Sequence, residues 1–296
     1  MESLLPPNAA ARGKRSAPPP LLWSDAGAVS AAVRQWGIRY RAHNGVPRPA
    51  VVLVPAQYNP RNRPPPLRLV ISPHGRGIRA ITNAGWWRDL PAQGNFAVVC
   101  PGGMGRRLPL YSWGWRGQIA DLARMPSIVR ATMAWLRIDL RHVYAVGGSM
   151  GGQETLLLVG QHPQLLAGAV AFDSVTNFYT RYGDFARIRG GRRLQALARL
   201  EVGGTPSSKT REYVLRSPSH WVREVARSGV PLQLWWSNAD EIVGQEHQSE
   251  HFYEELRRLR PRGRVEPVTG SWHHTAETYS HLELPAAVKW LGLVAQ

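Results

Sequence analysis

The chain has 296 residues, of which 43% are hydrophobic and 19% charged, and this balance excludes a wholly disordered protein. No run of about 18 apolar residues occurs, which excludes a membrane-spanning helix, and the single cysteine, Cys100, excludes an internal disulfide and a cysteine-based zinc cluster. A formal net charge of +17 first suggests nucleic acid or an acidic surface as the partner.

The positive charge comes almost entirely from arginine, because only three of the 37 basic residues are lysines. The arginines are spread from Arg12 to Arg264 rather than gathered in one stripe, and no zinc-finger spacing accompanies them. The distribution therefore favours a compositional preference for arginine, and we do not expect nucleic acid as a partner.

The first 22 residues are rich in proline and basic residues and offer little apolar surface to bury. We therefore predict a flexible tail over residues 1–22, followed by a single domain over residues 23–296. Leu4 and Leu5 are followed at once by two prolines, so the apolar centre of a secretory signal is missing. Together with the single cysteine, this predicts a cytoplasmic protein.

Short apolar runs alternate with longer helical patterns along the domain. The runs predict about eight strands, at residues 37–40, 50–55, 67–72, 96–100, 142–146, 167–172, 232–236 and 264–268. The helical patterns cover residues 119–136, 151–161, 245–259 and 276–291. Apolar runs without alternation are typical of strands buried on both faces, so the sequence predicts an α/β fold with a mostly parallel, doubly wound sheet.

One stretch, residues 174–230, interrupts this alternation. It is helical in part and contains two turn-like glycine pairs, Gly190-Gly191 and Gly203-Gly204. We predict an insertion over the sheet edge that acts as a lid.

The strongest motif is G-x-S-x-G, present as Gly147-Gly148-Ser149-Met150-Gly151 between a predicted strand and a predicted helix. A serine at the tip of such a turn has strained backbone angles, and small neighbours let the strand and helix pass closely. Its hydroxyl is accessible at the carboxyl ends of the strands. The N–H groups at the start of the following helix point to the place where an attacked carbonyl group would form an oxyanion. The pattern predicts that Ser149 is a nucleophile and that Met150 supplies one N–H donor.

A serine nucleophile needs a base, and the base needs an acid that orients it. His273 and His274 follow the last predicted strand on one loop, and their positions alone do not separate them. Asp240 is the candidate acid because it follows the strand at 232–236 and precedes an apolar step into the next helix. Its neighbour Glu241 and the more distant Asp173 are alternatives, and Asp240 could instead only cap the following helix.

A second oxyanion donor is expected in the turn after the strand at 67–72, which carries the HGxG-like run His74-Gly75-Arg76-Gly77. We expect the backbone N–H of Arg76 to be this donor, with His74 shaping the turn rather than transferring protons. The proposed chemistry requires no metal and no organic cofactor.

These motifs resemble the α/β-hydrolase superfamily, in which serine, acid and histidine follow in this order. Residues 35–294 are most similar to the catalytic domain of prolyl oligopeptidase and acylaminoacyl-peptidase relatives. In that group a W-x-H-[ST] pattern carries the base, which implies His274 in Trp272-His273-His274-Thr275. The peptidases carry a β-propeller before this domain, and only about 35 residues stand here, so the resemblance is to a form without its propeller.

The resemblance implies a serine hydrolase, and the HGxG turn, which is similar to that of stand-alone esterases, favours carboxylic esters over peptides. A peptidase or amidase of the prolyl oligopeptidase type is the first alternative, and a basic binding protein on a hydrolase scaffold is the second. Acyl transfer to an alcohol or amine would use the same residues. The substrate and the oligomeric state stay open, although Arg76 or the arginines at 187–193 would suit an anionic substrate, and loop tryptophans such as Trp113 would suit an apolar pocket.

Overall fold

The computed structural model describes residues 23–274 and 283–295, and in this part of the chain nine strands form one sheet. The strand order is β1-β2-β3-β5-β4-β6-β7-β8-β9. The strands are β1 (Trp23–Ala28), β2 (Val33–Arg41), β3 (Pro47–Pro55), β4 (Leu67–Ile71), β5 (Phe96–Pro101), β6 (Ile138–Gly148), β7 (Gly168–Phe172), β8 (Leu232–Ser237) and β9 (Val265–Gly270). β1, β2, β3 and β5 pair antiparallel, and every pairing from β5 through β4 to β9 is parallel.

The mostly parallel sheet confirms the predicted α/β-hydrolase fold, and all eight predicted strands are present. The ninth, β1, pairs with β2 and was not predicted, because its run of serine, aspartate and glycine lacks the apolar character of the others. Three strands inside the sheet, β5, β7 and β8, are buried at every position, as expected for strands covered on both faces.

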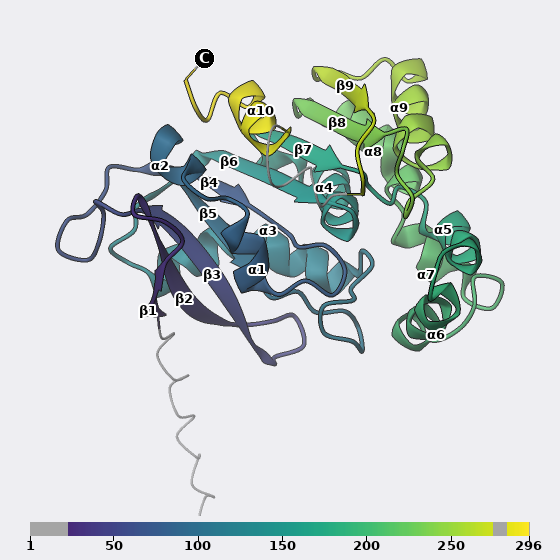
Figure 1. Ribbon diagram of the computed structural model, residues 1–296, viewed down its shortest axis with the longest axis horizontal. Coiled ribbons are helices and arrows are strands. Elements are labelled where there is room, and N and C mark those ends of the chain that lie inside the picture. Colours follow the sequence, from purple (N-terminus) through teal and green to yellow (C-terminus); the bar gives the residue numbers. More distant parts are fainter. Residues whose placement is uncertain (1–22, 275–282, 296) are drawn as a thin grey trace, which may run out of the picture.

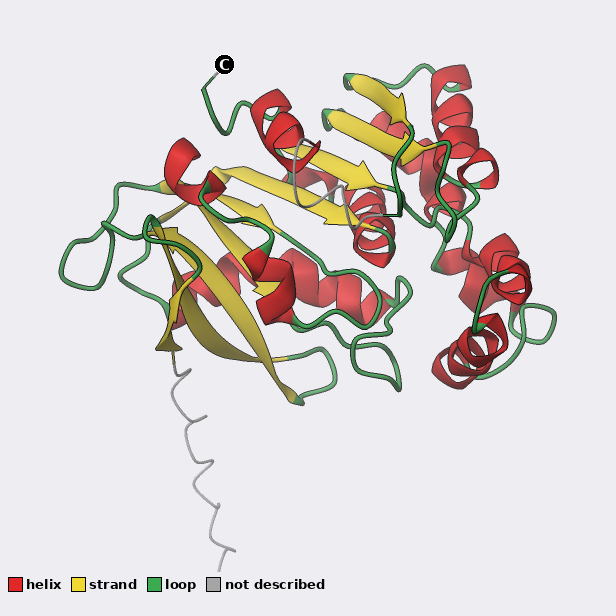
Figure 2. Cartoon of the chain, in the orientation of Figure 1, coloured by secondary structure: helices red, strands yellow, loops and turns green. Residues whose placement is uncertain are grey.

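Helices cover both faces of this sheet (Figure 2). The helices are α1 (Ala80–Gly85), α2 (Leu90–Gly94), α3 (Arg116–Thr132), α4 (Met150–Gln161), α5 (Phe178–Asp184), α6 (Gly191–Val202), α7 (Thr210–Leu215), α8 (Val222–Arg227), α9 (Ser249–Arg258) and α10 (Glu283–Trp290). One apolar cluster joins the sheet to α3, α4, α8 and α9, and a second joins its other face to α1, α2 and α10. Four of these helices, α3, α4, α9 and α10, overlap the four predicted helical patterns. Residues 276–282 of the last pattern lie outside the described residues.

The predicted helix at 245–259 divides into a short 3-10 turn, Gln245–His247, and α9. Gln248 stands at the break with φ −124° and ψ −103°. Its side-chain carbonyl oxygen accepts hydrogen bonds from the backbone N–H groups of Thr176 and Asn177, at 2.9 and 2.8 Å. The break thus joins α9 to the segment that follows β7.

The residues between β7 and β8 carry α5 to α8, and α5, α6 and α7 lie at the end of the molecule toward which β6 and β7 point (Figure 1). Helices α5, α6 and α7 contribute to a third apolar cluster, which includes Phe178, Phe185 and Tyr213 together with Met150 of α4. Gly190 and Gly203, one from each predicted glycine pair, flank α6 with φ of 72° and 97°. That this segment acts as a lid stays a prediction.

In the described part of the chain, no helix is long and apolar enough to cross a membrane.

Candidate active site

Ser149 occupies a sharp turn between β6 and α4, with φ 56° and ψ −121°. The two motif glycines make this turn possible. A Cβ on Gly147 would lie 2.5 Å from the carbonyl oxygen of Gly151, and a Cβ on Gly151 would lie 2.4 Å from that of Pro73. The strained serine conformation costs about 1–3 kcal/mol and persists because the surrounding packing holds it. The motif therefore folds as the sequence predicted.

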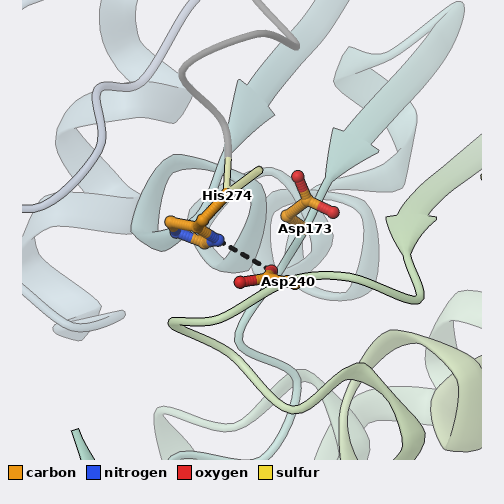
Figure 3. A group of neighbouring side chains, drawn as sticks. All are labelled: Asp173, Asp240 and His274. Carbon is orange, nitrogen blue, oxygen red and sulfur yellow. Dashed lines mark hydrogen bonds and ion pairs between the residues drawn. The ribbon is translucent and has the colours of Figure 1, made fainter. Parts of the chain in front are cut away.

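A chain of two hydrogen bonds links Ser149 to His274 and His274 to Asp240. The hydroxyl Oγ of Ser149 lies 2.9 Å from Nε2 of His274. Nδ1 of the same ring lies 2.7 Å from Oδ2 of Asp240 (Figure 3). The side chains of His274 and Asp240 are 10% and 1% exposed. With the ring proton on Nδ1 facing the carboxylate, Nε2 is left to accept the serine proton.

The Asp240 carboxylate is held by donors on both oxygens. Oδ1 accepts from the backbone N–H groups of Ile242 and Val243, each at 2.9 Å, and Oδ2 accepts from Nε2 of Gln245 at 2.8 Å. Burial acts to raise the pKa of Asp240, but the hydrogen bonds from His274 and these donors outweigh it and leave the pKa below its usual value. Asp240 therefore fixes the local turn and also faces the imidazole. The sequence did not predict the contact of Gln245 with Asp240, because no motif around Gln245 indicates that it holds a carboxylate.

The two alternative residues lie outside this chain of hydrogen bonds. His273 is 73% exposed, and its Nδ1 lies 3.5 Å from Oε2 of Glu241. Glu241 is itself 53% exposed and accepts a hydrogen bond from the backbone N–H of His274 at 3.3 Å. Of the two adjacent histidines, the structure brings His274 to Ser149.

Asp173, at the end of β7, anchors the histidine loop. Its φ is 40°, and its two carboxylate oxygens accept from the backbone N–H of Ser237 at 3.0 Å and from Nε1 of Trp272 at 2.9 Å. Among the described residues, ligand atoms of Asp173, Asp240 and His274 form a group within 4.8 Å of one another (Figure 3). Because hydrogen bonds already engage Asp173 and Nδ1 of His274, we assign this group to holding the loop rather than to a cation.

The HGxG-like turn after β4 packs directly against the Ser149 turn. His74 is fully buried; its Nδ1 donates to the carbonyl of Gly75 at 2.7 Å, and its Nε2 accepts the backbone N–H of Gly103 at 2.9 Å. Burial lowers the pKa of His74, which favours the neutral ring that this pair of bonds requires. His74 thus shapes the turn. The assignments of the Arg76 and Met150 N–H groups as oxyanion donors stay predictions.

A small pocket opens beside Ser149, which forms part of its wall. Apolar side chains and two arginines line it: Trp113, Met150, Val175, Phe185, Ile242 and Val243, with Arg76 and Arg181. Trp113 is the pocket tryptophan, whereas Trp87, Trp235 and Trp236 belong to the apolar clusters on the two faces of the sheet. Sequence reasoning missed Arg181, since no motif surrounds it.

Comparisons with known proteins bear on the family and the fold. A model of the prolyl oligopeptidase family matches residues 121–292. A search among curated proteins finds no match. Among solved structures, acylaminoacyl peptidase from Pyrococcus horikoshii is similar at TM-score 0.63 and 15% identity, over 83% of this chain and only 38% of that protein. S-formylglutathione hydrolase from Agrobacterium tumefaciens is similar at TM-score 0.66 and 15% identity, over 92% and 98% of the two chains. A fungal esterase from Rhizomucor miehei is similar at TM-score 0.64 and 14% identity, over 88% and 82%.

Proposed function

The chain belongs to the prolyl oligopeptidase family, and from this premise we propose that it is a serine hydrolase that cleaves carboxylic esters through an acyl-enzyme on Ser149. The observation that carries the proposal is the hydrogen-bond chain from Ser149 through His274 to Asp240, at 2.9 and 2.7 Å. A serine hydroxyl becomes a useful nucleophile when such an imidazole removes its proton.

The first half of the reaction transfers the acyl group to the enzyme. Oγ of Ser149 attacks the ester carbonyl while Nε2 of His274 takes the hydroxyl proton, and Asp240 stabilises the imidazolium that forms. The tetrahedral intermediate collapses when the bond between the carbonyl carbon and the alkoxy oxygen breaks. His274 returns the proton to the departing alcohol.

Water completes the reaction. His274 takes a proton from a water molecule, the hydroxide attacks the acyl carbon, and the bond to Ser149 Oγ breaks as the proton returns to the serine. The products are one carboxylic acid and one alcohol. We assign the two oxyanion contacts to the backbone N–H groups of Met150, at the start of α4, and of Arg76, in the turn against which the Ser149 turn packs.

We favour esters over peptides because the HGxG-like turn at residues 74–77 is similar to that of stand-alone esterases, and two of the similar structures are an S-formylglutathione hydrolase and a fungal esterase. Peptide or amide cleavage remains the second candidate function, since the family match and the peptidase fold both favour it.

The test compares one acyl group on two leaving groups, 4-nitrophenyl hexanoate and hexanoyl-4-nitroanilide. We expect ester turnover that falls by about six orders of magnitude in Ser149→Ala. Ser207→Ala, an exposed serine in the turn between α6 and α7, is the matched control and keeps the wild-type rate. Full ester hydrolysis by Ser149→Ala contradicts the proposal, and a higher kcat/KM for the anilide than for the ester moves the assignment to the amidase.

A further inference from the structure

Two guanidinium groups line the pocket beside Ser149. Arg76 comes from the turn after β4, and Arg181 comes from α5, in the helical segment between β7 and β8 (Figure 1). Arg181 is only 2% exposed, so its charge is placed in the interior rather than in solvent. The arginine-rich run at 187–193, by contrast, has its arginines exposed. The inward-facing cations of this segment therefore differ from those that the sequence indicated.

Neither guanidinium is neutralised by a carboxylate among the residues that the structure describes. Both instead face the ring of Phe185, with Cζ of Arg181 at 4.7 Å and Cζ of Arg76 at 6.0 Å from its centroid. Asp184, the nearest acid along the chain, points to Arg187 at 3.7 Å. Asp240, the other acid whose field reaches Arg181, is engaged with His274. Cation–π contact offsets only a small part of the cost of burying Arg181 close to a second, half-buried cation, Arg76.

Both side chains stay charged at neutral pH. Burial, with a smaller contribution from the nearby charge of Arg76, lowers the pKa of Arg181 to about 10, and burial also lowers the pKa of Arg76. A pair of unneutralised cations in a low-dielectric pocket attracts an anion more strongly than the same pair would in water. Planar guanidinium groups suit the planar carboxylate in particular.

Apart from Ser149, the other side chains of the pocket wall are apolar, and they suit the apolar part of a ligand. Trp113, Val175 and Val243 supply apolar surface to the same pocket that the two arginines and Ser149 line. We propose that this pocket binds esters that carry a carboxylate on a short apolar chain near the scissile carbonyl, with Arg76 and Arg181 holding the carboxylate. The inference rests on the proposed ester hydrolysis and names its substrate class.

The experiment uses two esters of equal chain length, 4-nitrophenyl hexanoate and the mono-4-nitrophenyl ester of adipic acid, with the full-length protein. We expect the wild type to favour the adipate in kcat/KM by about tenfold or more, as a charge-assisted hydrogen bond supplies. Arg181→Gln is expected to remove most of this preference, and Arg181→Lys to keep part of it. Arg187→Gln, an equal change of charge at a side chain that is 80% exposed, leaves the preference unchanged.

A second arm places the carboxylate on the leaving group, with 3-carboxy-4-nitrophenyl hexanoate. A preference in either arm that Arg181→Gln removes supports the inference and identifies the side that carries the anion. If Arg181→Gln fails to fold, the wild-type preference is measured at rising NaCl concentration, where an electrostatic preference shrinks.

The inference is overturned if the wild type shows no higher kcat/KM for the carboxylate ester than for 4-nitrophenyl hexanoate in either arm. It is also overturned if Arg181→Gln keeps as large a preference for the carboxylate ester as Arg187→Gln does. Either result, with hexanoate turnover intact, leaves ester hydrolysis standing. Absence of turnover for all three esters instead contradicts the proposed function itself, so the two failures are distinguishable.

Discussion

Glu154 in α4 buries a carboxyl group whose ionisation opposes folding. Its side chain is fully buried, accepts hydrogen bonds from Ser112 and from Nε2 of Gln118, and has its pKa raised by burial to about 7 from 4.5, because those bonds only partly offset desolvation. Below pH 4.5 both the folded and unfolded states are protonated. Between pH 4.5 and 7 the unfolded chain releases the proton while the folded protein keeps it, so stability falls as pH rises and levels off above 7.

The magnitude follows from the two pKa values. The difference of about 2.5 corresponds to about 3 kcal/mol at full ionisation, of which about 2–3 kcal/mol is lost between pH 5 and pH 8. Glu154→Gln removes this titration. Urea unfolding of both proteins at the two pH values isolates the effect, because all other groups titrate alike in both.

We therefore expect the wild type to lose about 2–3 kcal/mol more than Glu154→Gln from pH 5 to pH 8. The variant's absolute stability is not the readout, since a glutamine amide offers one oxygen where the carboxyl group offers two, to Ser112 and Gln118, and this changes the buried hydrogen bonds. Glu254→Gln, at a side chain that is 50% exposed, serves as the control and keeps the wild-type pH dependence. Parallel pH dependence of the wild type and Glu154→Gln would refute the reasoning.

Three further predictions concern the base, the serine turn and a buried ion pair of α6. His274→Ala lowers kcat for 4-nitrophenyl hexanoate by about five to six orders of magnitude, whereas the exposed His273→Ala keeps the wild-type kcat; equal losses would contradict the choice of base. Gly151→Ala, whose Cβ would lie 2.4 Å from a backbone oxygen, loses ester turnover and unfolds at lower urea, whereas Gly183→Ala, with nothing within 4 Å, does neither. Glu201→Gln lowers the free energy of unfolding by about 3–5 kcal/mol. Its carboxylate accepts hydrogen bonds from three backbone N–H groups and pairs with the buried guanidinium of Arg216 at 3.1 Å. A loss below about 1 kcal/mol in urea unfolding would show that this ion pair is dispensable.

Strands buried on both faces were readable from the sequence because each is a short apolar run closed by proline, glycine or a polar residue. β4 ends at Ile71, just before Ser72, and β5 ends at Pro101; both are observed where they were predicted. β1 was missed because it is held by backbone pairing to β2 rather than by an apolar pattern of its own. Antiparallel strands at a sheet edge need no such pattern.

Some residues of the candidate site could be predicted from the sequence, and others could not. Ser149 and Asp240 were chosen as candidates because Ser149 directly follows β6 and Asp240 lies in the loop after β8, and both loops have a distinctive local sequence. His274 was separated from His273 only through the family pattern, since the orientation of two adjacent side chains depends on contacts such as that between Trp272 and Asp173. Arg181 could not be found, because its helix reaches the pocket only through tertiary packing around Phe185.

The most direct test of the central claim is the site of covalent labelling by a fluorophosphonate, located by peptide mass spectrometry. Such reagents phosphonylate a serine that a neighbouring imidazole has activated, so they report nucleophile and base together. The account predicts one phosphonate on Ser149, no labelling of Ser149→Ala, and loss of labelling in His274→Ala but not in His273→Ala. Labelling of a different serine, or of Ser149→Ala, would contradict it.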